Sequence, residues 1–194
     1  GGCDRHGRVP ILPHLNDLVR VRRELGMTIR VHPGLPDEET AAGLAKLDID
    51  GAMVDIIGDN RTIREVYHLD AGTQDYDEAM ERLNRHGVPL VPHIILGLHF
   101  GKMLGEWKAL EMTAKHQLKL LVLVILMPLN GTEMQNVSPP SLKEIEMMKH
   151  RQSVISALQL KTREKEYFRK LMDKKITALS FENMEVEDEM LPVV

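Results

Sequence analysis

Short apolar runs alternate with longer amphipathic stretches along almost the whole chain. The apolar runs predict β-strands. The four strongest runs and two weaker ones are 28–32, 51–57, 89–96 and 118–127, then 154–158 and 176–181. The stretches between them predict helices at 15–25, 37–47, 76–86, 102–116 and 162–174. Strands and helices that alternate in this way, joined by right-handed crossovers, form parallel α/β folds.

The number of strands limits the architecture further. The strands are continuous apolar runs rather than apolar–polar alternations, which indicates a parallel sheet buried on both faces. A closed barrel of eight strand–helix units typically needs ~250 residues, whereas this chain has 194. We therefore expect a partial parallel (β/α) barrel, similar to an incomplete TIM barrel, followed by a C-terminal strand–helix–strand unit.

Local signals place the ends of several elements. Pro36 and Asp37 stand where a helix N-terminus favours proline and acidic residues. Gly26 and Gly87 fall just past predicted helix ends, where a left-handed residue is often needed. Turn-forming and acidic residues predict loops or turns at 70–75, 130–140 and 182–190.

Composition excludes several classes of function. A net charge of −4 gives no general attraction to nucleic acid or to an anionic membrane. The apolar run 118–129 is interrupted by Lys119 and is shorter than the ~20 residues that span a bilayer. The single Cys3 excludes an internal disulfide and fits a reducing compartment. Since no signal peptide and no initiator methionine open the chain, we expect a cytoplasmic protein whose true N-terminus lies upstream.

Polar residues recur where the predicted strands end. Ligands of parallel barrels bind at the carboxyl ends of the strands, so these positions are candidates for a site. They are Gly1 to Asp4, Arg30, His32, Asp55, Asp59, His93, His99 and residues 128–132. Ordinary loop residues explain the same pattern equally well, and from the residues alone both interpretations stay open.

Five segments carry a family resemblance when they are taken in order. They are Gly-Gly-Cys-Asp at 1–4, Thr-Ile-Arg-Val-His-Pro-Gly-Leu at 28–35, Gly-Ala-Met-Val-Asp at 51–55, Val-Pro-His-Ile-Ile-Leu-Gly-Leu at 91–98 and Leu-Met-Pro-Leu-Asn-Gly at 126–131. In this order they resemble successive motifs of radical S-adenosylmethionine enzymes, in the branch similar to biotin and lipoyl synthases. The resemblance covers about residues 1–140 and implies a barrel that binds S-adenosylmethionine.

The resemblance also implies roles for individual residues. Gly1, Gly2 and Cys3 resemble the double-glycine motif whose backbone receives the methionine amino group of the cofactor, and glycine permits such close approach. Asp55 falls where the family commonly places a polar ribose contact. The implied cofactor-binding set is Gly1, Gly2, Cys3, Asp55, His93, Ile95, Gly97, Leu126, Met127 and Pro128. The predicted substrate pocket contains Arg30, His32 and His99.

The cysteine content departs from this family. Radical S-adenosylmethionine enzymes hold a [4Fe–4S] cluster through three closely spaced cysteine thiolates upstream of the double glycine, whereas Cys3 is the one cysteine here. We therefore expect a fragment of such an enzyme that retains part of the cofactor surface and lacks radical catalysis. An upstream reading frame would have to supply the three cysteines.

The C-terminal segment resembles a different family. Pro-Pro-Ser-Leu at 139–142 and the residues that follow, to 194, resemble the N-terminal domain of alanine dehydrogenase. In that family a lysine precedes the Pro-Pro segment and a histidine acts in catalysis, but here 135–137 is Gln-Asn-Val and Gln159 takes the aligned position of the histidine. The alternative interpretation is therefore a chimera or a non-catalytic α/β protein, with domains at 1–138 and 139–194.

The remaining candidate residues are also explained by purely structural roles. His32, His93 and His99 suggest a metal trio, but they come from separate strands without an acidic helix motif. We therefore predict no metal site and hydrogen-bonded structural histidines. Asp59 is more simply the cap of a helix than the partner of Asp55 in an acid pair.

A barrel with missing strands is also expected to self-associate. Missing strands would leave sheet edges and apolar surface exposed. We expect self-association, a small-molecule ligand, and neither nucleic acid nor membrane as a partner.

Overall fold

The computed structural model describes residues 2–141 and, further on, the short segments 153–155, 177–179, 185–186 and 189–190. Three of the sequence predictions lie outside the described residues: the cofactor contact at Gly1, the aligned position Gln159 and the helix at 162–174. The chain forms two compact units. The first comprises Gly1–Ile94 and Leu104–Leu121, and the second comprises Ile95–Met103 and Val122–Val194. None of the three boundaries between these segments falls at residue 139, and the predicted seam stays a prediction about ancestry.

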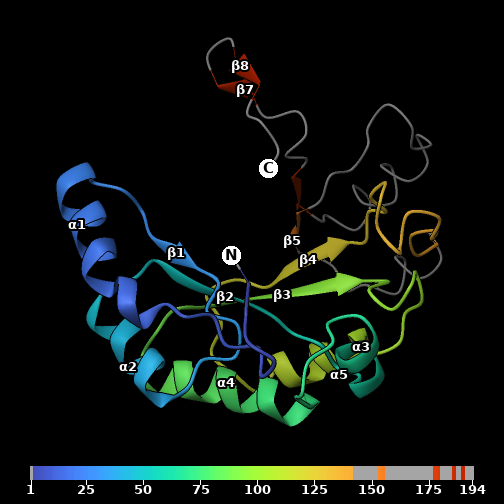
Figure 1. The fold of residues 1–194 in the computed structure, drawn as a ribbon, viewed down its shortest axis with the longest axis horizontal. Helices are drawn as coiled ribbons and strands as arrows, with labels where there is room; N and C mark the ends of the chain where they lie inside the picture. The colour runs from blue at the N-terminus through green and yellow to red at the C-terminus, as the bar shows by residue number, and fades with distance from the viewer. Residues whose placement is uncertain (1, 142–152, 156–176, 180–184, 187–188, 191–194) are drawn as a thin grey trace. The chain divides into compact units, whose positions relative to one another are not determined.

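The first unit is a parallel sheet with helices. β1 (Arg30–Val31) pairs with β2 (Gly51–Asp55), and β2 pairs with β3 (Leu90–Leu96), which continues into the second unit. Both pairings are parallel, which confirms the predicted α/β class. The helices are η1 (Leu12–His14), α1 (Leu15–Leu25), α2 (Glu38–Lys46), α3 (Asn60–Glu65), α4 (Thr73–Arg85) and α5 (Glu106–Thr113). In Figure 1, α2, α4 and α5 lie together on one side of β2 and β3.

The core of the first unit lies between this sheet and the helices that cover it. Ala52 and Val54 of β2 and Leu90 of β3 are at most 1% exposed. Leu44 of α2 and Leu83 of α4 are 0% exposed. Each fully buried Val or Leu side chain stabilises the fold by about 1.5–3 kcal/mol relative to an exposed one, so this layer holds the strands in register.

The opposite face of the sheet is only half-buried within this unit. Side chains alternate along a strand, so Met53 and Asp55 of β2 point away from Ala52 and Val54. Met53, Asp55 and His93 are all intermediate in exposure. The sequence predicted burial on both faces. On this second face Val91, the partner of Met53, is buried, whereas the polar Asp55 and His93 stay partly exposed.

The second unit is built on further parallel strands. β4 (Val122–Ile125) pairs with β5 (Ser153–Ile155), and β5 pairs with β6 (Thr177–Leu179), all in parallel. The end of β3 joins them, since the Leu126 amide donates to the Leu96 carbonyl at 3.0 Å. β7 (Glu185–Val186) and β8 (Glu189–Met190) form a short antiparallel pair within the segment that the sequence predicted as a turn.

Several predicted boundaries shift in the structure. α1 has the predicted bounds and ends at Gly26 in left-handed conformation (φ 64°). α4 begins at Thr73, inside the predicted loop 70–75, because the Gly72 amide donates to the Asp75 carboxylate at 2.7 Å and thereby caps the helix. β1 and α5 are shorter than predicted, and α5 starts only after Gly105.

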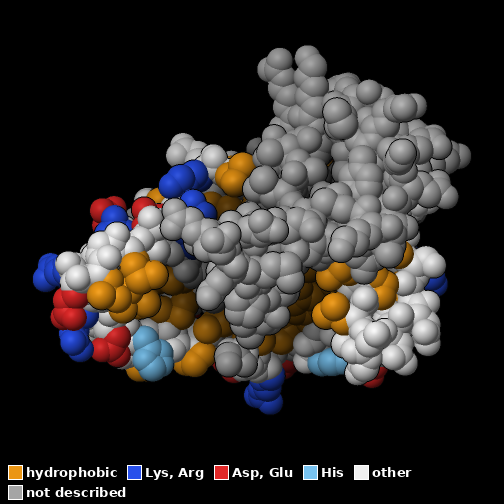
Figure 2. All heavy atoms as spheres, turned by 90° about the horizontal axis from the view of Figure 1, so that it is seen from above, with side chains coloured by type: hydrophobic (Ala, Val, Ile, Leu, Met, Phe, Trp, Pro, Cys, Tyr) orange, Lys and Arg blue, Asp and Glu red, His pale blue; other side chains and the backbone are white. Residues whose placement is uncertain are grey.

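The surface keeps some large hydrophobic side chains exposed. They are Leu25, Met27, Trp107, Leu120 and Leu129, at 39–67% exposure. Figure 2 shows hydrophobic side chains interspersed with charged ones on the face that it draws. Self-association through such surface stays a prediction. No helix in the described part of the chain is long and apolar enough to cross a membrane.

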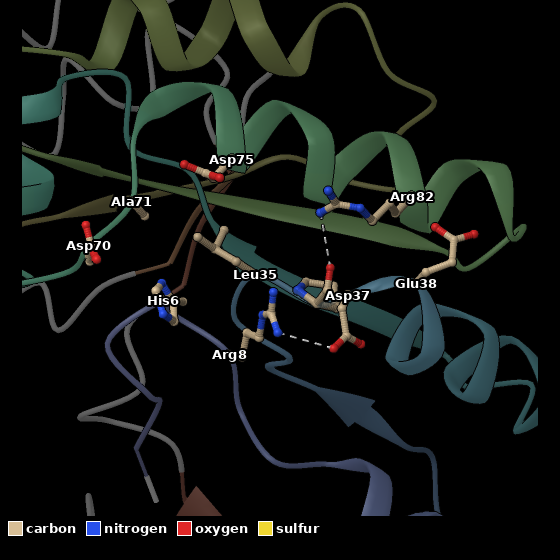
Figure 3. Close-up of a pocket in the computed structure, with 10 residues that line it drawn as sticks. His6, Arg8, Leu35, Asp37, Glu38, Asp70, Ala71, Asp75 and Arg82 are labelled. Carbon is tan, nitrogen blue, oxygen red and sulfur yellow. Dashed lines mark hydrogen bonds and ion pairs between the residues drawn. The ribbon is translucent and has the colours of Figure 1, made fainter.

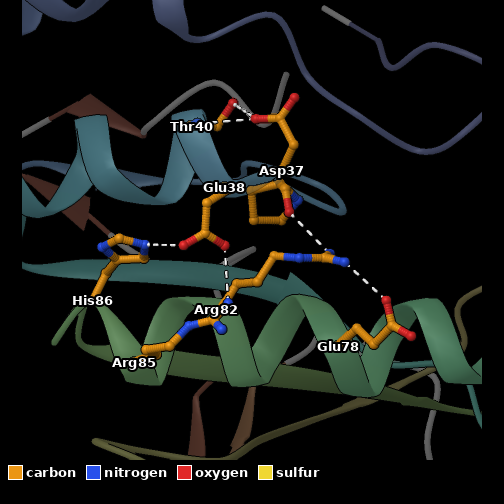
Figure 4. Close-up of polar contacts among 8 residues, drawn as sticks. Asp37, Glu38, Thr40, Glu78, Arg82, Arg85 and His86 are labelled. Atoms are coloured by element: carbon orange, nitrogen blue, oxygen red, sulfur yellow. Dashed lines mark hydrogen bonds and ion pairs between the residues drawn. The ribbon is translucent and has the colours of Figure 1, made fainter.

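The start of α2 is fixed by charged and polar contacts (Figure 4). Asp37 caps the helix: one carboxylate oxygen accepts from the Thr40 amide at 3.0 Å and from the Thr40 hydroxyl at 2.7 Å. These hydrogen bonds hold the pKa of Asp37 below its usual value. Glu38, the next residue, pairs with Arg85 at 2.9 Å and with His86 at 2.7 Å. The contacts of Glu38 join the start of α2 to the end of α4.

We expect Asp37→Ala to lower the free energy of unfolding by about 1–2 kcal/mol near neutral pH, because the helix loses its cap. Urea denaturation measures the change. Asp17→Ala, which removes an exposed acid from the first turn of α1, is the matched control and should cost less than about 0.5 kcal/mol.

The effect of Asp37→Ala should also depend on pH. Since the folded state lowers the pKa of Asp37, its stabilisation is present above the unfolded pKa and is lost as the pH falls through the folded one. The difference from wild type should therefore shrink below about pH 4. A difference that is the same at neutral and acidic pH would contradict the capping role.

Candidate functional site

Three polar side chains meet where β1 and β2 end, beside the middle of β3. The β2–β3 register places Asp55 directly beside His93. His32 directly follows β1, the strand that pairs with β2 on its other side. The His93 Nδ1 lies 3.5 Å from the Asp55 Oδ1. The His32 and His93 rings meet edge to face, with centroids 5.2 Å apart and planes at 64°. One ligand atom from each of the three residues lies within 4.8 Å of the others.

Tyr67 holds the second oxygen of Asp55. Its hydroxyl donates to the Asp55 Oδ2 at 3.3 Å. Burial, reinforced by the negative charge of Asp55, raises the pKa of Tyr67 far above its usual value, and burial likewise raises that of Tyr76. Tyr67 therefore stays a protonated donor, and the remaining Asp55 oxygen faces the histidines.

His32 has the most open position of the three. It is exposed, although part of its ring faces the protein, and this partial burial lowers its pKa. The positive charge that His93 can carry lowers it further, whereas the carboxylate of Asp55 raises it. Burial has the largest effect, so the neutral imidazole is favoured near neutral pH.

A cavity of about 360 Å³ opens beside these residues. Its wall is mostly apolar, with a few polar groups, which is typical of small-molecule sites. The lining residues are Gly2, Cys3, Gly7, Val9, His32, Gly34, Leu35, Met53, Val54, Asp55, Tyr67, Leu69 and Tyr76. The N-terminal segment, the ends of β1 and β2 and the loop before α4 thus form one pocket within the first unit.

Backbone contacts hold the N-terminal segment over this cavity. The Leu35 amide donates to the Gly7 carbonyl at 2.8 Å, and the Val9 amide donates to the Pro33 carbonyl at 3.2 Å. Gly34 has φ 65°, and a side chain on it would collide with the Gly7 carbonyl. Gly34 therefore allows the loop after β1 to approach the N-terminal segment closely.

A second, more polar cavity of about 330 Å³ lies next to the start of α2. Figure 3 shows Arg8 and Arg82 pointing toward this helix start. Arg8 pairs with Asp37 at 3.6 Å, and Arg82 donates to the Pro36 carbonyl at 3.5 Å and pairs with Glu78 at 2.8 Å. These arginines already have structural partners, so the cavity beside Asp55 is the better ligand site.

The predicted site residues divide between the two units. Gly2, Cys3, His32 and Asp55 line the cavity of the first unit, and His93 contacts Asp55. Arg30 is exposed in β1 and is absent from the cavity lining. The predicted residues of the second unit are Ile95, Gly97, His99, Leu126, Met127 and Pro128.

The second unit places its predicted residues at strand ends too. Ile95 lies in β3, and Gly97 follows it in left-handed conformation (φ 79°). The segment 126–128 follows β4. The His99 ring packs edge to face on Phe100 at 5.4 Å, so the structure groups His32 and His93 with Asp55 rather than with His99.

Asp59 has a structural role, as the capping interpretation predicted. Its Oδ1 accepts from the Arg61 amide at 2.9 Å and from the Thr62 amide at 3.1 Å, at the start of α3. Sequence reasoning missed Tyr67 and Tyr76. Tyr67 lies in an irregular segment after α3, and no local pattern relates it to Asp55.

The cysteine content does not fit an iron–sulfur cluster. A cluster of the family type needs three thiolates. Cys3 supplies one exposed thiol and is the one cysteine in the sequence. The apolar cavity with its exposed glycine backbone at Gly2 does fit an organic cofactor, because the backbone there is open to close approach.

The fold is shared with a solved enzyme. No family model and no curated protein matches the sequence. Among solved structures, the chain is similar to methylornithine synthase, a radical S-adenosylmethionine enzyme, with a TM-score of 0.65 and 13% sequence identity. The likeness covers 95% of this chain and 55% of the other, so the chain spans about half the length of that enzyme.

This likeness establishes the fold. The chain has a parallel α/β fold consistent with the partial TIM-like barrel that the sequence predicted, and it shares this fold with methylornithine synthase. An alanine dehydrogenase origin for the C-terminal segment has no support from the comparisons.

The pKa of His32 tests the arrangement of the three side chains. We expect His32 to titrate below the usual histidine value, Asp55→Asn to lower its pKa further, and His93→Gln to raise it, because each variant removes one charge from its surroundings. NMR titration of the imidazole C–H signals measures these shifts. Asp77→Asn, which removes a carboxylate beside His116, is the control and should leave His32 unchanged. If Asp55→Asn also left it unchanged, Asp55 would not lie beside His32.

Proposed function

We propose that this chain is part of a radical S-adenosylmethionine-type barrel and that it binds S-adenosylmethionine at the carboxyl ends of its strands. The cavity that Gly2, Cys3, His32 and Asp55 line carries this proposal. It lies at the strand ends, where parallel barrels bind ligands. It also brings the N-terminal glycine segment next to the end of β2, in keeping with the cofactor roles that the sequence resemblance implies.

The residues divide the task of binding. The open backbone at Gly2 would receive the methionine end of the cofactor, because no side chain obstructs it. The Asp55 carboxylate would accept hydrogen bonds from ribose hydroxyls, with Tyr67 fixing its orientation. Leu35 and Leu69 offer apolar surface in the same cavity.

We propose that radical catalysis belongs to a longer protein of which this chain is a part. With one cysteine, the chain does not bind a [4Fe–4S] cluster of the family type by itself. We therefore assign it cofactor binding without reductive cleavage. The inactivity of the isolated chain and its origin as a fragment are part of this proposal.

Binding of S-adenosylmethionine by isothermal titration calorimetry tests the cofactor site. We expect one molecule to bind per chain and Asp55→Asn to weaken binding by about 10–100-fold, the effect of removing one hydrogen bond to a charged group. Asp17→Asn, on the exposed surface of α1, is the matched control and should bind as wild type does. No detectable binding, or equal affinity in Asp55→Asn, would overturn the proposal.

The coding sequence upstream tests the enzyme origin separately. We expect three closely spaced cysteine codons in the same reading frame, before the codons of the double glycine. An upstream frame without them would remove the radical-enzyme interpretation and leave a non-catalytic binding protein.

A further inference from the structure

Two histidines and one carboxylate from three neighbouring parallel strands converge: His32 just past the end of β1, Asp55 at the end of β2 and His93 in the middle of β3. His32, Asp55 and His93 each offer one ligand atom, and these atoms lie within 4.8 Å of one another. Imidazole nitrogens and a carboxylate oxygen are ligands that zinc and related transition metals prefer. We propose that these three residues bind one divalent transition-metal ion of the zinc class.

The spacing suits such an ion. Two ligand atoms that each lie ~2.0–2.1 Å from a tetrahedral zinc ion are about 3.3 Å apart. The His93 Nδ1 and the Asp55 Oδ1 are already 3.5 Å apart. The third ligand, His32, is exposed and lies just past the end of β1, so a change in its side-chain torsions completes the set.

A supporting contact orients the carboxylate. Ligating side chains in metal sites are usually held by a second group that hydrogen-bonds to them. Tyr67 fills this role, because its hydroxyl donates to the Asp55 oxygen that does not face His93. Tyr67 follows α3 and belongs to none of the three strands. Its contact with Asp55 therefore does not depend on how the strands pair.

An open coordination position follows from the surroundings. His32 and Asp55 also line the cavity of about 360 Å³. Three protein ligands with the fourth position open to a cavity are the arrangement of catalytic rather than structural zinc sites. The ion would therefore carry a water or a ligand atom from the cavity.

Two other histidine–carboxylate pairs provide a contrast. His86 lies 2.7 Å from Glu38, and His116 lies 2.9 Å from Asp77. Each pair joins elements of the helical layer, and neither belongs to a group of three ligands in the described part of the chain. These pairs supply matched controls, since both histidines are also close to an acid.

Zinc binding by these three side chains does not require bound S-adenosylmethionine, and the metal is titrated in its absence. Loss of cofactor binding with intact zinc binding, and the reverse, are therefore distinguishable results.

Zinc titration of the full chain in metal-free buffer tests the proposal. Every protein carries Cys3→Ser, so that the exposed thiol cannot bind the ion. We expect one zinc ion per chain by calorimetry, with affinity reduced at least about 100-fold in His32→Gln, His93→Gln and Asp55→Asn, and about 10-fold in Tyr67→Phe. His86→Gln and His116→Gln should bind as the parent does.

Cobalt(II) provides a second readout. The visible absorption of the bound ion should appear in the parent and the two control variants, and should be lost in His32→Gln. His32 is exposed, so this variant keeps its fold, which circular dichroism checks, and the test does not depend on His93→Gln folding. No stoichiometric ion in the parent, unchanged affinity in His32→Gln, or an equal loss in a control variant would each overturn the proposal.

Discussion

The parallel register between β2 and β3 places Asp55 directly beside His93, and the rest of the site is arranged around this pair. A slip of one residue would turn every side chain of a strand to the other face. Asp55 would then enter the layer that Ala52 and Val54 occupy, where an unpaired charge is costly. The buried residues under the helices thus fix the position of the polar residues above them.

The second constraint is the close approach of the N-terminal segment. Gly34 lets the loop after β1 meet the Gly7 carbonyl, and Gly2 and Cys3 thereby reach the cavity beside Asp55. The cavity is apolar with few polar groups, which suits an organic ligand, while the adjacent histidine–carboxylate group suits an ion. Parallel barrels in general bind ligands at this end of the strands. The likeness to methylornithine synthase, at 13% identity, shows the fold alone.

Local signals predicted local structure well. The bounds of α1 followed from helical spacing, and the start of α2 near Asp37 followed from the preference of helix N-termini for proline and acidic residues, because both depend on neighbouring residues alone. The grouping of His32 with Asp55 depends on strand register, which spacing along the chain does not encode, and the sequence suggested His99 as the third member instead. Tyr67 was missed for the same reason, since its partner is twelve residues away in an unrelated element.

The central claim is that His32, Asp55 and His93 form one site. Crystals of the zinc-loaded chain, measured at the zinc absorption edge, test it most directly. We expect one anomalous peak at about 2.0–2.2 Å from a ring nitrogen of each histidine and from an Asp55 oxygen. A peak bound elsewhere on the chain, or no peak between these side chains, would contradict the account.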